Sequence, residues 1–208
     1  MRQDLSQARV TTIVTACSNC YMTLKKTLGD GSELGSGSPS ASFQVLSLYP
    51  LLRDWGLGKE VQAAHPDGYP CLRGQTLTLH DPCPTRFETD IHEAVRGLLD
   101  DLQVPWTEYP LHAQKTLCCG RGGGGGMAHP QIGLKQKDRR IQETPTSALV
   151  SYCSTCVEQL RHGPEKSLYT VHLLDLLFAP DTPVSQETIG AMKKWYNRYQ
   201  LARFVSHA

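Results

Sequence analysis

The cysteines are the residues whose type and spacing most clearly suggest chemistry. Cys83 is followed by the adjacent pair Cys118 and Cys119, and later by Cys153 and Cys156 in a C-x-x-C arrangement. Soft thiolates in a reducing environment bind iron-sulfur clusters, zinc or copper(I). Two adjacent cysteines can each reach a different iron of one cluster, whereas a tetrahedral zinc site needs only four ligands. We therefore expect these five thiols to hold an iron-sulfur cluster rather than zinc.

Three further cysteines lie outside this group. Cys17 and Cys20 form another C-x-x-C. They are metal ligands shared with a partner, a redox-active dithiol at a helix N-terminus, or a remnant without function. Cys71 fits no motif position and is expected to be a free or buried thiol. We retain Cys17 and Cys20 as candidate metal ligands.

Glycines and a histidine flank the main group of cysteines. Gly120, Gly122 and Gly123 follow the adjacent pair. Because these residues lack a Cβ, their backbone N–H groups can approach a cluster and donate hydrogen bonds to its sulfides. His80 lies just before Cys83, where it either donates a hydrogen bond to the cluster or caps the turn that follows. These three glycines and His80 are therefore the candidate cofactor-binding residues.

Apolar runs and amphipathic stretches alternate along the chain. Strands are expected at 76–80, 115–117 and 147–152, each before one of the cysteine groups. Helices are expected at 87–102, which has a continuous apolar stripe, and at 131–142. This alternation indicates an α/β fold with a parallel sheet and right-handed crossovers. Parallel strands end at one edge of the sheet, where ligands bind, so the cysteines are expected to meet there.

The composition limits the partners of the protein. Of 208 residues, 21 are Lys or Arg and 20 are Asp or Glu, and the net charge of +1 provides no field that would attract nucleic acid. One basic group is expected on a solvated helix face: Lys135, Lys137, Arg139 and Arg140. No apolar run reaches the roughly eighteen residues of a membrane span, and no apolar N-terminal segment predicts secretion. We therefore expect a cytoplasmic protein with reduced cysteines.

The sequence contains an internal repeat. A β-branched run, a C-x-x-C and the start of a helix occur at 12–20 and again at 148–156. The apolar spacing at 45–51 also recurs at 171–177, where it is expected to mark a helix face in both copies. Two half-molecules of one design are therefore expected, of which the first is incomplete.

The cysteine pattern resembles that of a known family. The segments 80–83 (HDPC), 118–120 (CCG) and 153–156 (CSTC) resemble the cysteine-rich CCG domain found in the heterodisulfide reductases. They are equally similar to the iron-sulfur oxidoreductase subunits of glycolate, lactate and glycerol-3-phosphate oxidation. The resemblance extends from about Val10 to about Pro180 and implies an α/β parallel-sheet CCG domain with flanking helices.

The resemblance also implies a redox function. Members of the family usually carry two such motifs in tandem, and in the heterodisulfide reductases each motif holds a noncubane 4Fe-4S cluster that reduces a disulfide. This chain is thereby expected to be an oxidoreductase subunit with a 4Fe-4S cluster, active in a complex with a flavoprotein or ferredoxin-like subunit. The alternative, from another functional class, is a zinc-stabilised protein-interaction module without redox activity.

The first motif departs from the family pattern. In the second repeat 33 residues separate the Cys-Cys pair from its C-x-x-C, whereas sixteen residues precede Cys17. The matching cysteines are therefore expected on a separate polypeptide or in upstream sequence. The expected parts of the chain are an incomplete first repeat at 1–66, a complete CCG domain at 67–180, and a C-terminal helix at 181–208 packed on the body.

Overall fold

A parallel β-sheet forms the centre of the chain. The computed structural model describes residues 10–29, 43–121, 128–187 and 190–206, together with Leu5 and Gln7. The sheet has the strand order β4-β3-β5-β6, and every neighbouring pair is parallel. Its strands are β3 (Leu77–His80), β4 (Trp106–Glu108), β5 (Ala148–Ser151) and β6 (Tyr169–His172). The central strands β3 and β5 are buried along their whole length, as strands covered on both faces must be.

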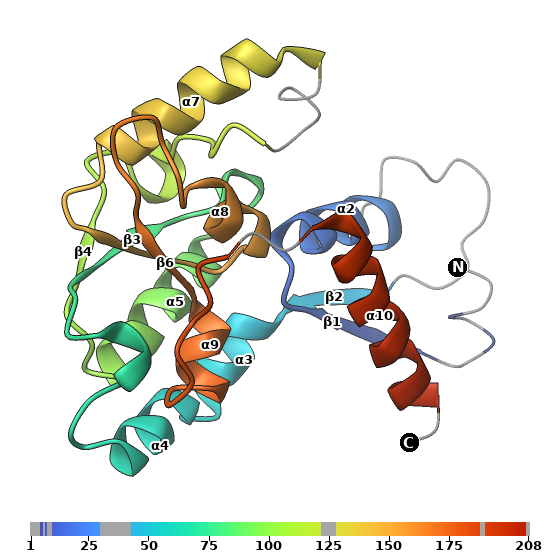
Figure 1. The fold of residues 1–208 in the computed structure, drawn as a ribbon. Coiled ribbons are helices and arrows are strands. Elements are labelled where there is room, and N and C mark those ends of the chain that lie inside the picture. The colour runs from blue at the N-terminus through green and yellow to red at the C-terminus, as the bar shows by residue number, and fades with distance from the viewer. Residues whose placement is uncertain are drawn as a thin grey trace.

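Helices cover both faces of this sheet (Figure 1). They are α3 (Leu48–Asp54), α5 (Thr89–Asp101) and α9 (Leu173–Phe178) on one face, and α7 (Pro130–Gln142) and α8 (Ser154–Gln159) on the other. Because side chains of a strand point alternately to the two faces, Leu79 joins the core with α5, whereas Leu149 packs with residues of α7 and α8. A further helix, α4 (Leu57–Ala64), packs against α5. The predicted α/β fold is confirmed.

Most of the expected elements are present. The strands expected at 76–80 and 147–152 are β3 and β5, and the helices expected at 87–102 and 131–142 are α5 and α7. Helix α5 forms because its apolar side chains recur at helical spacing and are buried along one stripe.

The segment before Cys118 differs from the expectation. Residues 115–117 form no strand, and a short 3-10 turn followed by a loop occupies this region. The Asp81 carboxylate accepts the backbone N–H of Ala113 at 2.7 Å, and the Thr116 hydroxyl donates to the Asp81 carbonyl oxygen at 2.7 Å. Side-chain hydrogen bonds therefore replace a strand ladder in bringing Cys118 to the sheet edge.

The chain connections create a ligand-binding position at the ends of β3 and β5. From β3 the chain runs through α5 to β4 at one edge of the sheet, and it then returns through α7 to β5 on the other side of β3. In open α/β sheets, ligands bind outside the carboxyl ends of the strands at such a change of direction. Cys83 follows β3 and Cys153 follows β5, so both lie at this position.

The internal repeat is visible in the structure. The N-terminal elements are β1 (Thr12–Thr15), α2 (Ser18–Leu28) and β2 (Gln44–Ser47). They form a parallel strand-helix-strand unit outside the main sheet (Figure 1), and β5, α8 and β6 form a matching unit within it. Val45 and Val171 lie in β2 and β6, so the expected inclusion of these two valines in a helix face is wrong. The helices α3 and α9 begin only after these strands.

The last helix, α10 (Ala191–Ser206), exposes apolar side chains. The exposed large side chains of this helix are Met192, Trp195, Tyr196, Tyr199, Leu201 and Phe204. Lys194 pairs with Glu158 of α8 at 2.5 Å, which ties the start of α10 to the main body. Among the described residues, no helix combines the length and the apolar character that crossing a bilayer requires.

Candidate metal centre

Five thiols meet at the carboxyl edge of the main sheet. Their contacts run in one row, which is Cys83, Cys118, Cys119, Cys156 and Cys153. Cys119, Cys153 and Cys156 are buried, whereas Cys83 and Cys118 are partly exposed. The structure thus brings together the cysteines that the spacing selected, from three separate segments of the chain.

The contacts between the thiols are pairwise, and each thiol contacts its neighbours in the row. Among the described residues, no three cysteine, histidine or carboxylate side chains are grouped as ligands of a single metal ion. A tetrahedral zinc ion needs four ligands that converge at about 2.3 Å. A cluster with several irons takes each thiolate at its own metal atom, so successive paired thiols fit a multinuclear group better than one zinc ion.

The thiols of the row differ in their pKa values. The Cys156 thiol and the backbone N–H groups at the start of α8 lower the pKa of Cys153 to about 6. The hydrogen bond with Cys118, together with burial, raises the pKa of Cys119 to about 11. Contacts with Cys119 and Cys153, and burial, raise the pKa of Cys156 well above its ordinary value. Because ligation requires thiolates, metal binding must release protons from the buried thiols.

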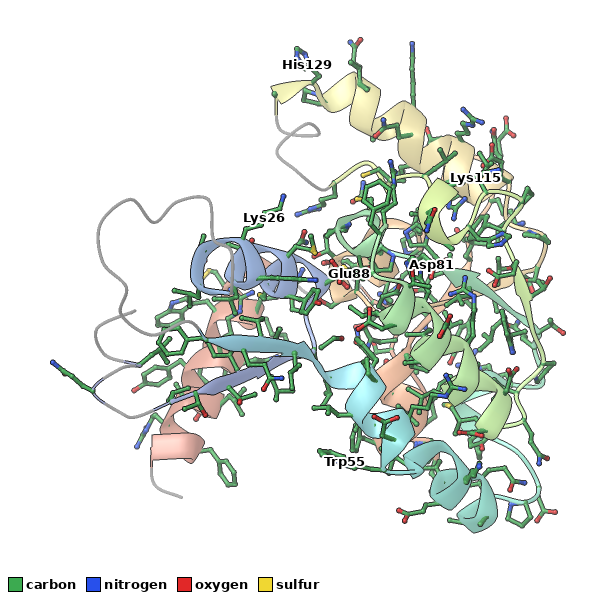
Figure 2. All side chains as sticks on the ribbon, turned by 180° about the vertical axis from the view of Figure 1, so that it is seen from behind. Lys26, Trp55, Asp81, Glu88, Lys115 and His129 are labelled. Atoms are coloured by element: carbon green, nitrogen blue, oxygen red, sulfur yellow. The ribbon has the colours of Figure 1, made fainter. Side chains whose placement is uncertain are left out.

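Asp81 stabilises the loops that carry the cysteines. Its side chain is fully buried within the main body (Figure 2). Its carboxylate accepts two hydrogen bonds from Arg96, at 2.8 and 3.2 Å, and one from the Tyr152 hydroxyl at 3.1 Å. Burial alone would raise the pKa of Asp81, but the Arg96 guanidinium outweighs it and holds this pKa below the ordinary 3.8. Both carboxylate oxygens are engaged in structural contacts, so Asp81 positions the site instead of reacting.

His80 ends β3 and is fully buried. Its Nδ1 accepts a hydrogen bond from Arg140 Nε at 3.1 Å, whereas its buried Nε2 has no partner in the part of the chain that the structure describes. Burial and the neighbouring Arg140 charge lower the pKa of His80 to about 3, so the ring is neutral. The imidazole therefore binds Arg140, and no described residue supplies an acceptor for its other nitrogen.

The position of Arg140 corrects the sequence analysis. The expectation that it lies on a solvated face is wrong, because Arg140 is fully buried. Its guanidinium stacks over the Tyr109 ring at 3.4 Å and donates to the Leu111 carbonyl oxygen at 2.9 Å. The buried positions Gly133, Arg140 and Ile141 share one face of α7. An arginine tolerates such a face when acceptors and an aromatic ring receive its charge.

The backbone at Gly120 requires a glycine. Its φ is +85°, in the left-handed region, and a Cβ there would overlap the Gly133 carbonyl oxygen of α7. The N–H of Gly120 donates to Cys118 Sγ at 3.3 Å. Gly122 and Gly123 lie outside the described residues.

We expect Gly120→Ala to lower the free energy of unfolding by about 2–3 kcal/mol, because left-handed strain and steric overlap add. Gly74→Ala is a matched control, since Gly74 has a φ of +69° and a Cβ there would meet nothing within 4 Å. The control should cost about 1 kcal/mol from backbone strain alone. Urea unfolding measures both values. Equal losses in the two variants would contradict the close approach between Gly120 and α7.

Cys17 and Cys20 lie beside the row of five thiols. Cys17 caps α2, and its Sγ accepts the Cys20 N–H at 3.4 Å. The Cys17 thiol, burial and the nearby Cys153 raise the pKa of Cys20. The Ser18 hydroxyl joins α2 to the main body by donating to the Tyr152 carbonyl oxygen at 3.4 Å. Both thiols are exposed, so they form an open pair adjacent to the larger group.

Comparison with known proteins agrees with the cysteine pattern. Residues 77–161 match the family model described as "Cysteine-rich domain", CCG. The chain is 25% identical to an uncharacterized iron-sulfur protein of Methanococcus maripaludis, over 83% of this chain and 33% of the relative. It is 25% identical to one subunit of the dihydromethanophenazine:CoB–CoM heterodisulfide reductase of Methanosarcina barkeri, over 73% of this chain and 35% of the relative.

A third relative belongs to another reductase. It is one subunit of the fumarate reductase (CoM/CoB) of Methanothermobacter marburgensis, 24% identical over 82% of this chain and 33% of the relative. The chain thus spans about a third of the length of these relatives. The matched segment contains β3, β4 and β5 and the whole row of five thiols. The similarity to the CCG family therefore lies in residues 77–161, the segment that carries all five thiols.

Proposed function

We propose that this chain is an iron-sulfur redox subunit of a reductase complex. In this proposal the five thiols, from Cys83 to Cys156, bind one 4Fe-4S cluster, of the noncubane or the cubane type. The observation that carries the proposal is the row of paired thiols at the carboxyl ends of β3 and β5. The similarity to two reductase subunits and to an iron-sulfur protein supports it.

The exposure of the cysteines suggests different roles for the buried and the partly exposed thiols. When bound, the cluster supplies one-electron transfer between a flavoprotein or ferredoxin-like partner and an acceptor. Reduction of a disulfide acceptor consumes two electrons and two protons and yields two thiols. Cys119, Cys153 and Cys156 are buried and would hold the cluster away from water. Cys83 and Cys118 are partly exposed and form the side that a partner or acceptor reaches. We expect the protein to act in the cytoplasm, where such thiols stay reduced.

The exposed pair Cys17 and Cys20 supports a second, partial site. Two thiols are too few to hold a cluster, since iron-sulfur clusters commonly take four cysteines. We infer that another polypeptide supplies the remaining ligands when the complex forms. The adjacency of Cys20 to Cys153 would place that second site directly beside the first.

Metal and sulfide analysis of the anaerobically purified full chain tests the proposed function. We expect iron and labile sulfide in equal amounts, a brown colour, and bleaching by dithionite, because thiolate-bound iron absorbs visible light and is reducible. A variant with Cys17→Ser and Cys20→Ser should retain the same iron and sulfide content. A colourless protein that contains zinc and no sulfide would instead indicate the zinc-stabilised interaction module.

A further inference from the structure

Two buried N–H donors near the thiol row lack an acceptor. Among the described residues, His80 Nε2 and Arg86 Nε are buried and make no hydrogen bond within the protein. A buried donor without an acceptor is costly and occurs seldom in folded proteins. Each of these two donors therefore indicates an acceptor that the described residues do not supply.

The hydrogen bond from Arg140 determines which ring nitrogen of His80 carries the proton. Arginine has only donors, so the hydrogen bond from Arg140 Nε requires that His80 Nδ1 be the acceptor. In a neutral imidazole the proton then sits on Nε2. Arg140 is held in turn by the Tyr109 ring and by the Leu111 carbonyl oxygen. His80 therefore presents a fixed Nε2–H donor, and Arg140 links it to the segment before Cys118, because Arg140 Nη2 also donates to the Thr116 hydroxyl at 3.4 Å.

Arg86 occupies the corresponding place near Cys83. Its Nη2 donates to the Thr116 carbonyl oxygen at 2.7 Å, which fixes the guanidinium and leaves Nε–H unused. The Arg86 backbone N–H donates to the Cys83 carbonyl oxygen at 3.4 Å, so the two residues are close. Since the Cys83 and Cys118 thiols touch each other, the two unused donors flank one end of the thiol row.

We propose that His80 Nε2–H and Arg86 Nε–H donate hydrogen bonds to sulfur atoms at the Cys83 and Cys118 end of the bound cluster, and thereby raise its reduction potential. The inference rests on the proposed iron-sulfur function and adds two positioning residues to it. Reduction adds negative charge to the cluster, so N–H donors stabilise the reduced state more than the oxidised state. Arg86 is not marked by any motif in the sequence; its unused buried donor is what identifies it.

A redox titration of the anaerobically purified full chain, followed by visible absorption and electron paramagnetic resonance, tests this inference. We expect Arg86→Met and His80→Leu each to shift the midpoint potential to a more negative value. Arg86→Lys keeps the charge but removes Nε–H, and it should also shift the potential downward. Arg139→Met removes an exposed charge of α7 and serves as the matched control, with no expected shift.

The outcomes separate this inference from the proposed function. An unmodified chain without iron and sulfide contradicts the proposed function itself. If the unmodified chain carries a cluster and Arg86→Met keeps the same potential, then only the role of the two donors is overturned. Arg86→Lys with an unchanged potential would show that charge, and not the hydrogen bond, is what matters at Arg86. The Arg86 variants keep the test valid even if the replacement of buried His80 prevents folding.

Discussion

Cys119→Ala is expected to abolish cluster binding, with loss of the visible absorption and of bound iron and sulfide. Cys119 lies in the middle of the thiol row, where it contacts both Cys118 and Cys156. Its side chain is 2% exposed, so water or a solvent-borne thiol has little room to replace the missing ligand. Elemental analysis and absorption spectra of the anaerobically purified variant measure the effect.

Cys71→Ala is the matched control for this variant. The sequence predicts a free or buried thiol at this position, and Cys71 is a buried member of the apolar core. Burial raises the pKa of Cys71 to about 11, the value that the Cys118 hydrogen bond and burial give Cys119, but Cys71 has no contact with the thiol row. Cys71→Ala should therefore keep the full iron content. Retention of the spectrum in Cys119→Ala would show that the other four thiols are enough to hold the cluster.

Asp81→Ala is expected to lower the free energy of unfolding by about 3–5 kcal/mol, because it removes one partner of a buried ion pair. The substitution leaves the Arg96 guanidinium without its carboxylate partner. It also removes the acceptor of the Tyr152 hydroxyl and of the Ala113 N–H. Arg139→Ala breaks an exposed ion pair on the surface of α7 and should cost about 0.3–0.5 kcal/mol. Urea unfolding at neutral pH compares the two variants.

The difference in unfolding free energy between the unmodified chain and Asp81→Ala should depend on pH, and this dependence tests whether the difference is electrostatic. The pKa of Asp81 is lowered in the folded protein, so its stabilisation is present above the ordinary pKa of 3.8. It is lost as the pH falls through the lower folded value. The gap between the unmodified chain and Asp81→Ala should therefore shrink on acidification below that range. A gap that stays constant with pH would assign the effect to packing instead of charge.

The sequence predicts the central elements well because their signals are local. The apolar stripe of α5 and the short apolar run of β5 each determine their own structure. The edge strand β4 was missed because its three residues are only partly buried and show no alternation. The loop before Cys118 was misassigned as a strand because its anchor, Asp81, lies far away in the sequence.

The sequence predicts which cysteines belong to the candidate site, but it does not predict the buried residues that surround them. Cysteine spacing selects the five thiols without any knowledge of the fold. The role of Arg140 is not predictable in the same way, because its neighbours on α7 are charged and its acceptors come from other segments. Local polarity therefore favours a solvated arginine, whereas tertiary contacts bury it. The unused donors of His80 and Arg86 appear only when every buried hydrogen bond is counted.

The contact between Cys153 and Cys156 makes the metal-free protein sensitive to oxidation. Cys153 has a pKa of about 6 and is a thiolate at neutral pH, and it touches the Cys156 thiol. A thiolate next to a thiol is the arrangement that oxygen or peroxide converts most readily, through a sulfenic acid, into a disulfide. Two of the ligands would then be bonded to each other and unable to accept iron. Insertion of the metal must consequently outpace oxidation each time a new chain folds.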